Sequence, residues 1–353
     1  PMAHLPTQLT PAAQATLDFI SSISGEYVLA GQHNYAPVGN TYSERVAQMT
    51  GRTPIMWGSD LSFIVEADTV DGHYHCGPLN VSDPGDPDCR LLDTDVDTAR
   101  DKVVRTAIEQ HRKGHIITLM WHCPFPTFGD KGDYSTVWAF ENRPDPETWE
   151  ALTTPGTALQ AQWQAQADRV AVTLARLRDA GVPVLWRPYH EMNGVWFWWC
   201  NHPGPHGFKR LWAMMHDRFV RHHRLDNLIW VWNANAPRER PGDEAYEYAE
   251  FYPGAERVDI LAADVYRNDY RQSHHDELVA LADGKPIALG EVGEVPTPQV
   301  LRQQPRWAWF MPWGCLVERN ENRTKVPLLY DDERVLTLEN VERVDSVYRI
   351  VES

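Results

Sequence analysis

Two glutamates stand at positions where a carboxylate is costly without a chemical task. Glu191 closes the mostly apolar run 182–191, and Glu291 closes the apolar run 287–291. An ionised side chain beside a buried strand costs free energy unless it is paired or used in a reaction. Two opposed carboxylates are what glycoside hydrolysis requires, because one protonates the leaving oxygen while the other attacks the sugar or activates water. We therefore predict a catalytic pair.

Aromatic side chains are frequent and bunched together. The chain has 15 Trp, 13 Tyr and 10 Phe, with dense runs at 196–199 and 307–309. About half of this ring surface is expected to fill the core. The remainder, beside His, Asn and Asp, matches a sugar ring, which has apolar C–H faces and a polar rim. This pattern favours a carbohydrate ligand.

Eight short apolar runs are the elements that must position these groups. They cover residues 27–32, 54–60, 116–122, 182–191, 228–233, 258–266, 287–291 and 307–313. Helical periods separate several of them, most clearly over 157–180, where Thr157 is the expected N-cap and Gly181 the expected stop. Eight alternating strands and helices predict an α/β fold, the (β/α)8 TIM barrel.

The barrel places function at the carboxyl ends of its strands. Glu191 and Glu291 then end the fourth and seventh strands and oppose each other across the mouth. Long connections at 61–115 and 123–181, after the second and third strands, are expected to wall a cleft. Because no repeat or linker divides the chain, we predict a single catalytic domain over residues 1–353.

The strand period of two makes a further prediction for the run that ends at Glu191. It places Arg187, Tyr189 and Glu191 on one face of the strand. The other face takes Trp186, Pro188 and His190. An arginine on the carboxylate's own face is expected to anchor a polar network in the barrel mouth.

The segment 186–199, which reads WRPYHEMNGVWFWW, closely resembles the acid/base motif of glycoside hydrolase family 26, the endo-β-1,4-mannanases and their relatives. The segment 289–293, LGEVG, resembles the family's nucleophile strand. Weaker matches lie at Gly31-Gln32, Trp121-His122 and 264–266. The resemblance covers the barrel from about Gly31 to Trp313.

The resemblance implies a retaining double displacement with Glu191 as acid/base and Glu291 as nucleophile. It also implies that Tyr266 hydrogen-bonds the nucleophile. The other substrate-binding residues that we expect are His122, His190, Trp196, Asp264, Trp313 and, in the inserted wall, Trp138. Trp138 has an equally good interpretation as a fold-stabilising side chain. The sequence departs from the family where Gly314 follows Trp313, since mannanases often carry an arginine there.

Charge and composition exclude several classes of protein. With 33 Lys+Arg against 49 Asp+Glu the net charge is −16, which argues against a nucleic-acid partner. No stretch approaches the ~18 apolar residues of a membrane span. The adjacent pairs His222-His223 and His274-His275 point apart, so we predict neither a metal nor a cofactor. A thiol nucleophile at Cys123, Cys200 or Cys315 lacks an evident oxyanion device.

The expected partner is β-mannan or a manno-oligosaccharide, and the expected state is a monomer. Cys76 and Cys89 bracket a loop and suggest a disulfide, which points to a secreted protein. Two alternatives stay open: the same mechanism on another β-glycan such as xylan or mixed-linkage glucan, and a barrel that binds carbohydrate without cleaving it. The two intact glutamates disfavour the binding barrel.

Overall fold

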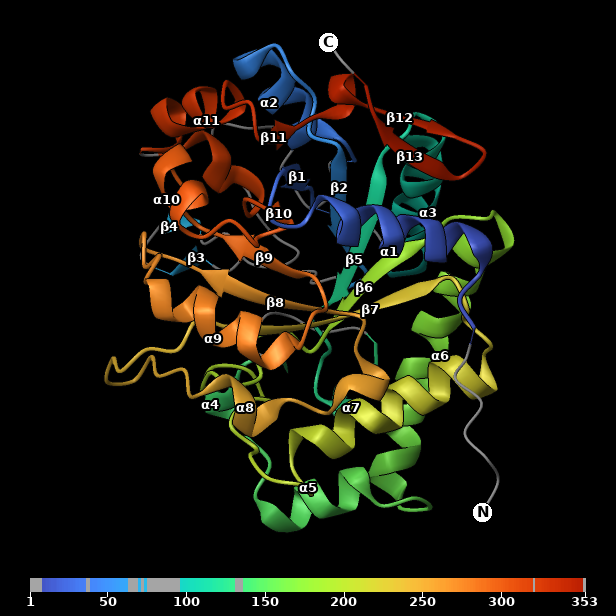
Figure 1. The fold of residues 1–353 in the computed structure, drawn as a ribbon. Helices are drawn as coiled ribbons and strands as arrows, with labels where there is room; N and C mark the ends of the chain where they lie inside the picture. Colours follow the sequence, from blue (N-terminus) through green and yellow to red (C-terminus); the bar gives the residue numbers. More distant parts are fainter. Residues whose placement is uncertain are drawn as a thin grey trace.

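A computed structural model describes residues 8–35, 39–62, 69–70, 73–74, 96–130, 136–319 and 321–351. Parallel strands pair in the order β10, β1, β2, β5, β6, β7, β8, β9. Between β9 and the last run, the bridges Ile287 to Trp307 and Val292 to Pro312 nearly close the ring. The (β/α)8 barrel predicted from the sequence is therefore confirmed (Figure 1).

All eight predicted runs become barrel strands, and every residue of these strands is buried. Strands covered on both faces tolerate the near-continuous apolar sequence seen here. Their bounds are β1 Val28–His33, β2 Met56–Asp60, β5 Ile116–Trp121, β6 Val184–Pro188, β7 Leu228–Asn235, β8 Ile260–Val265, β9 Ile287–Val292 and β10 Trp309–Phe310. The short β11 (Val335–Leu336) also pairs with β1. Two hairpins lie outside the barrel: β3 (Thr69–Val70) with β4 (His73–Tyr74), and β12 (Val341–Val344) with β13 (Val347–Ile350).

Helices of the described residues surround the barrel. Their bounds are α1 Pro11–Ile23, α2 Thr41–Thr50, α3 Val96–Arg112, α4 Ala139–Asn142, α5 Pro146–Thr153, α6 Ala158–Asp179, α7 Phe208–Asp217, α8 Tyr248–Phe251, α9 Gln272–Ala282, α10 Pro298–Gln303 and α11 Asn322–Tyr330. The predicted limits of α6 are confirmed: the Thr157 side chain caps it, and Gly181 follows it with φ of 72°. Among the helices described, none is long and apolar enough to cross a membrane.

The two long connections leave the ends of β2 and β5, as predicted. The first holds the β3–β4 hairpin and α3, and the second holds α4, α5 and α6. Cys76 and Cys89, which the sequence suggests as a disulfide pair, lie outside the described residues. Both connections depart from the barrel end where the strands carry their polar residues.

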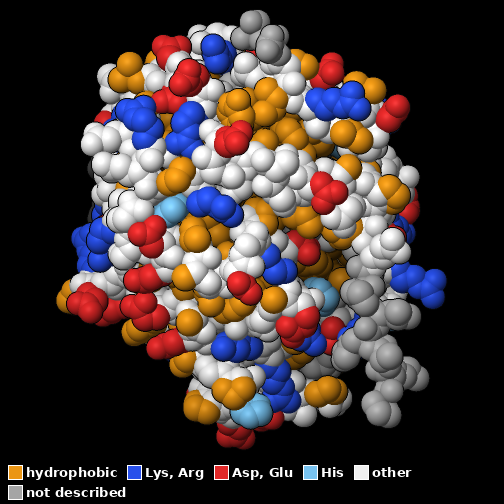
Figure 2. Space-filling model, in the orientation of Figure 1, with side chains coloured by type: hydrophobic (Ala, Val, Ile, Leu, Met, Phe, Trp, Pro, Cys, Tyr) orange, Lys and Arg blue, Asp and Glu red, His pale blue; other side chains and the backbone are white. Residues whose placement is uncertain are grey.

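The opposite end of the barrel is closed by the two termini of the chain. Phe19 of α1 stacks on Tyr348 of β13 with 5.4 Å between ring centroids. Both belong to a buried cluster with Leu29, Ile116 and Leu185 from the amino-terminal parts of the strands. Figure 1 shows α1, in blue, lying across the strands beside the red β12–β13 hairpin. On the face drawn in Figure 2, acidic and basic side chains are interspersed.

Candidate active site

A cleft of about 370 Å³ opens at the carboxyl ends of the barrel strands. Of the predicted site residues, all except Asp264 line it: His122, Trp138, His190, Glu191, Trp196, Tyr266, Glu291 and Trp313. The lining also includes residues that the sequence did not single out: Phe197, Asn235, Arg238, Gly242, Asp243 and Arg267. Six strand ends far apart in the sequence thus meet at one cleft.

The chain turns sharply after β6, and this turn aims Glu191 into the cleft. The strand ends at Pro188, and Tyr189 and Glu191 follow with φ of 49° and 57°, in the left-handed region. The alternation predicted as far as residue 191 is therefore wrong beyond Pro188. Tyr189 instead packs toward α6, where its hydroxyl accepts a hydrogen bond from the Trp163 indole at 2.7 Å. His190, predicted on the other face from Glu191, lines the same cleft.

Glu191 is a buried carboxyl with two side-chain donors. The Asn235 amide donates to Oε1 at 2.8 Å, and the Trp196 indole donates to Oε2 at 2.5 Å. Burial, followed by the negative charge of Glu291, raises its pKa to about 7, although the two hydrogen bonds act to lower it. Glu191 is therefore protonated over much of the pH range below neutrality, as a general acid requires.

Glu291 has a more strongly polar environment. Tyr266 donates its hydroxyl hydrogen bond to Oε1, and the Arg187 guanidinium donates to Oε2 at 3.0 Å. Burial and the charge of Glu291 raise the pKa of Tyr266 well above its usual value, so the phenol keeps its proton. The polar network expected around Arg187 is present, and it pairs with Glu291 across the barrel rather than with Glu191 on its own segment.

Asp264 lies beneath the cleft and is fully buried. Its carboxylate accepts hydrogen bonds from Asn233 at 2.8 Å and from Arg187 at 3.3 Å. Burial and the charge of Glu291 raise its pKa well above the ordinary value. The sequence predicted Asp264 as a substrate contact; in this arrangement it supports Arg187 and Asn233 from below.

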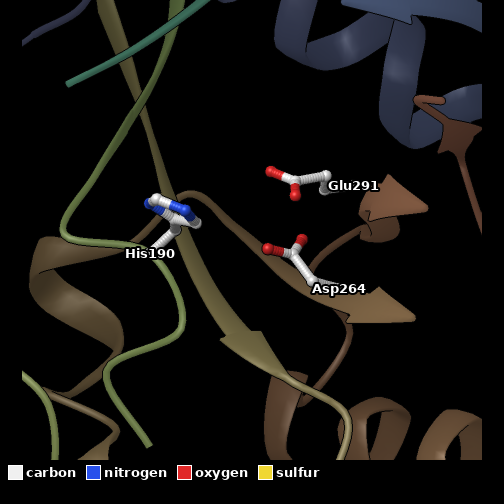
Figure 3. A group of neighbouring side chains, drawn as sticks. All are labelled: His190, Asp264 and Glu291. Carbon is white, nitrogen blue, oxygen red and sulfur yellow. The ribbon is translucent and has the colours of Figure 1, made fainter. Parts of the chain in front are cut away.

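His190, Asp264 and Glu291 bring three possible metal-ligand atoms within 4.8 Å of one another. Figure 3 shows both carboxylates directed toward the side of the barrel that carries His190. Arg187 already donates hydrogen bonds to both carboxylates, so a side-chain cation balances their negative charge. In the described part of the chain no other such cluster occurs. The pairs His222-His223 and His274-His275, for which the sequence predicts no metal, do not belong to it.

Two histidines face each other inside the cleft. His122 is fixed by its Nδ1, which lies 2.6 Å from the buried carboxylate of Asp60. Its ring meets His190 edge-on at 4.5 Å between centroids. Burial holds the pKa of His190 well below its ordinary value, so its imidazole is neutral. Its Nδ1 is buried and has no hydrogen-bond partner within the described residues.

Trp313 forms one aromatic wall of the cleft. His33, which was not predicted as a site residue, stacks on the Trp313 ring with centroids 4.0 Å apart, and burial lowers the pKa of His33 to about 3. Gly314 departs from the family pattern for a steric reason. A Cβ at this position would approach the Tyr35 ring to 2.0 Å. Tyr35 therefore occupies space that a side chain at position 314 would need.

Trp138 also lines the cleft, from the connection after β5. It is half-buried and stacks on Phe197 at 5.6 Å between centroids. Its ring both contacts the fold and borders the cleft, so the two interpretations of Trp138 are compatible.

The cysteines near the strand ends are unsuited to nucleophilic attack. Cys123 and Cys200 are buried free thiols, and burial raises the pKa of both well above the ordinary value. Cys315 is disulfide-bonded.

Comparison with known proteins places this cleft in a family context. Residues 91–339 match the sequence model of glycosyl hydrolase family 26. The chain is 33% identical over 340 residues to a mannan endo-1,4-beta-mannosidase of Thermothelomyces thermophilus, covering 94% of this chain and 61% of that relative. It thus spans less than two thirds of that protein's length.

Two solved structures extend the comparison. GH26A from a Muricauda species is 40% identical with a TM-score of 0.83, covering 96% of this chain and 100% of that one. A beta-mannanase from a symbiotic protist of the termite Reticulitermes speratus, complexed with gluco-manno-oligosaccharide, is 25% identical. Its TM-score is 0.73, over 95% of this chain and 97% of that one.

Proposed function

Because the chain belongs to glycosyl hydrolase family 26, we propose that it is an endo-β-1,4-mannanase that cleaves mannan, glucomannan or galactomannan with retention of configuration. One observation carries this proposal. Two buried glutamates line a single cleft, and burial and the charge of Glu291 raise the pKa of Glu191 to about 7. The names of the relatives support mannan as the substrate.

The environments of the two glutamates assign the steps. Glu291, oriented by Tyr266 and Arg187, attacks the anomeric carbon and forms a glycosyl ester as the C–O bond to the leaving sugar breaks. Glu191 gives its proton to that leaving oxygen. In the second half, Glu191 takes a proton from water, whose oxygen displaces Glu291 from the sugar. Two inversions restore the original configuration.

The sugar is held by groups around the reacting carbon. Trp313 and Trp196 offer ring faces to the apolar sides of the sugar, and His122 and His190 offer polar atoms to its hydroxyls. Because the imidazole of His190 is neutral, it donates or accepts a hydrogen bond without bringing a charge into the site.

We further propose that the barrel acts as one catalytic unit, as a secreted monomer. The strands from 28 to 310 share one ring and one cleft, which supports a single unit. The disulfide-bonded Cys315 supports an oxidising compartment.

The test is product release from a panel of mannan, glucomannan, galactomannan, xylan and mixed-linkage glucan, with sizing of the products. We expect short manno-oligosaccharides of mixed length from the three mannans, and no cleavage by Glu291→Ala. Preferred cleavage of xylan or mixed-linkage glucan would move the proposal to another β-glycan. A wild-type protein that binds mannan and releases nothing would make it a carbohydrate-binding barrel.

A further inference from the structure

One arginine contacts both residues that hydrogen-bond the Glu191 carboxyl. The Arg238 guanidinium lies over the Trp196 ring, 4.8 Å from its centroid. The same guanidinium donates to Asn235 Oδ1 at 2.6 Å. Trp196 donates to one oxygen of Glu191, and Asn235 donates to the other. Arg238 therefore contacts both of the residues that donate hydrogen bonds to the Glu191 carboxyl.

We propose that Arg238 is a positioning residue for the general acid/base, holding Trp196 and Asn235 in the orientation that directs both of their hydrogen bonds to Glu191. The inference rests on the proposed function, because it concerns the residue to which that function gives the proton transfers. Arg238 makes no hydrogen bond to Glu191 itself, so it acts through the two donors and through its charge.

Arg238 is itself held firmly. Its Nε donates to the Asp243 carbonyl at 2.8 Å, and its NH2 lies 2.5 Å from the Asp243 carboxylate. Its backbone forms an antiparallel bridge with Ala245. Only 17% of its side chain is exposed. All three guanidinium nitrogens are therefore engaged, which fixes the plane of the group over the indole.

The two donors belong to different parts of the chain. Trp196 is half-buried in the segment after the β6 turn, whereas Asn235 ends β7, so the two come from different elements. An asparagine side chain can rotate its amide, and its Oδ1 needs a donor so that Nδ2 points at Glu191. Arg238 supplies that donor, and its cation attracts the face of the indole.

The charged and titratable groups around Glu191 come from several elements. They are Arg187 of β6, Cys200 of the following segment, Arg238 after β7, Asp264 of β8, Tyr266 after β8 and Glu291 of β9. Arg187 is paired with Asp264 and Glu291. The positive charge of Arg238 lowers the pKa of Glu191, against the larger effects of burial and Glu291. Removing it must therefore move that pKa upward.

The experiment compares Arg238→Met and Arg238→Lys with wild type in pH–rate profiles on mannan. The matched control is Arg240→Met, two residues along the same loop, whose side chain is 58% exposed. For Arg238→Met we expect kcat to fall by about tenfold or more, since acid/base catalysis depends on orientation. We also expect the basic limb of kcat/KM to move to higher pH, with little change in KM.

Arg238→Lys keeps the charge and loses the planar fork. We expect its basic limb to stay near the wild-type pH while kcat still falls severalfold. Arg240→Met should match wild type in kcat and in the pH of the basic limb. Unchanged kcat and an unmoved limb in Arg238→Met would overturn the proposal, and so would a rise in KM alone, which would indicate a direct substrate contact. If Arg238→Met fails to melt cooperatively, Arg238→Lys decides: reduced kcat supports the proposal, and wild-type kcat overturns it.

A second measurement separates this inference from the proposed function. Carbon NMR of glutamate-labelled protein, with Glu191→Gln to assign the signal, follows the titration of Glu191 without any substrate. A wild type without activity would contradict the proposed function. A Glu191 titration midpoint at higher pH in Arg238→Met than in wild type would still support the positioning role of Arg238. An active wild type with the same midpoint in both proteins would overturn the inference alone.

Discussion

Glu191 and Glu291 carry the same functional group in different surroundings. Burial and a neighbouring charge raise the pKa of Glu191 to about 7, whereas Glu291 accepts hydrogen bonds from Tyr266 and Arg187. A general acid acts only while protonated. Cleavage of a sugar leaving group should therefore slow as the pH rises through about 7, because Glu191 loses its proton there.

Azide rescue should distinguish the two roles. Glu291→Ala lacks the nucleophile, so azide entering the vacated space should restore turnover and give a glycosyl azide of inverted configuration. Glu191→Ala should still form the glycosyl-enzyme from a mannoside with an acidic aryl leaving group, and azide should then release a product of retained configuration. Proton NMR of the anomeric signals is the measurement. The same anomer from both variants would contradict the assignment.

At the scale of single residues, the sequence located the glutamate pair and most of the cleft-lining aromatic and histidine residues. It did so because they follow apolar strands or lie within a long motif. Asn235 and Arg238 were missed. Asn235 ends β7 beyond the predicted run 228–233, and Arg238 lies in the connection after that strand, where no periodicity marks a polar residue. His33 was visible only as a strand end, and its stacking on Trp313 depends on the pairing of β1 with β10.

The strand period of two could not predict the turn that follows β6. Left-handed residues at 189 and 191 end the alternation, and the chain then folds back so that Trp196 reaches Glu191. Gly194 permits this return: a Cβ there would lie 2.4 Å from the Trp196 ring. The strands and α6 were predictable because burial repeats along them, whereas a turn of this kind depends on local contacts.

Gly194→Ala should therefore impair catalysis more than folding. The added methyl group displaces the Trp196 indole, which removes one hydrogen bond from Glu191, and we expect kcat on mannan to fall by roughly tenfold. The neighbouring Val195→Ala, which leaves the indole in place, serves as the control. Steady-state kinetics and thermal melting should be measured together. Full activity in Gly194→Ala would show that catalysis does not depend on this position of the Trp196 indole.

At the scale of the whole molecule, the two ends of the barrel have separate tasks. The carboxyl ends of the strands carry the cleft, while α1 and the β12–β13 hairpin close the other end with apolar contacts. The sequence predicted the eight strands. It did not predict this closure, because the segments that form it come from opposite ends of the chain and their contact leaves no local pattern.

Phe19→Ala should accordingly lower stability without changing the chemistry. Phe19 is 7% exposed and stacks on Tyr348, so its truncation should cost about 3 kcal/mol of the free energy of unfolding. Denaturant unfolding measures the loss, and kcat of the folded enzyme should equal that of wild type. A large loss of kcat with retained stability would show that the closed end communicates with the cleft.

The backbone conformation and the burial of Glu191 suit the proposed chemistry but lower the stability of the fold. A left-handed conformation disfavours a residue with a long side chain, and burying its carboxyl removes the group from water. Asparagine or glycine would hold the same turn with less strain. In its proposed role as proton donor, Glu191 therefore lowers the melting temperature of the barrel: selection for heat resistance alone would replace it and yield a more stable protein without the proposed activity.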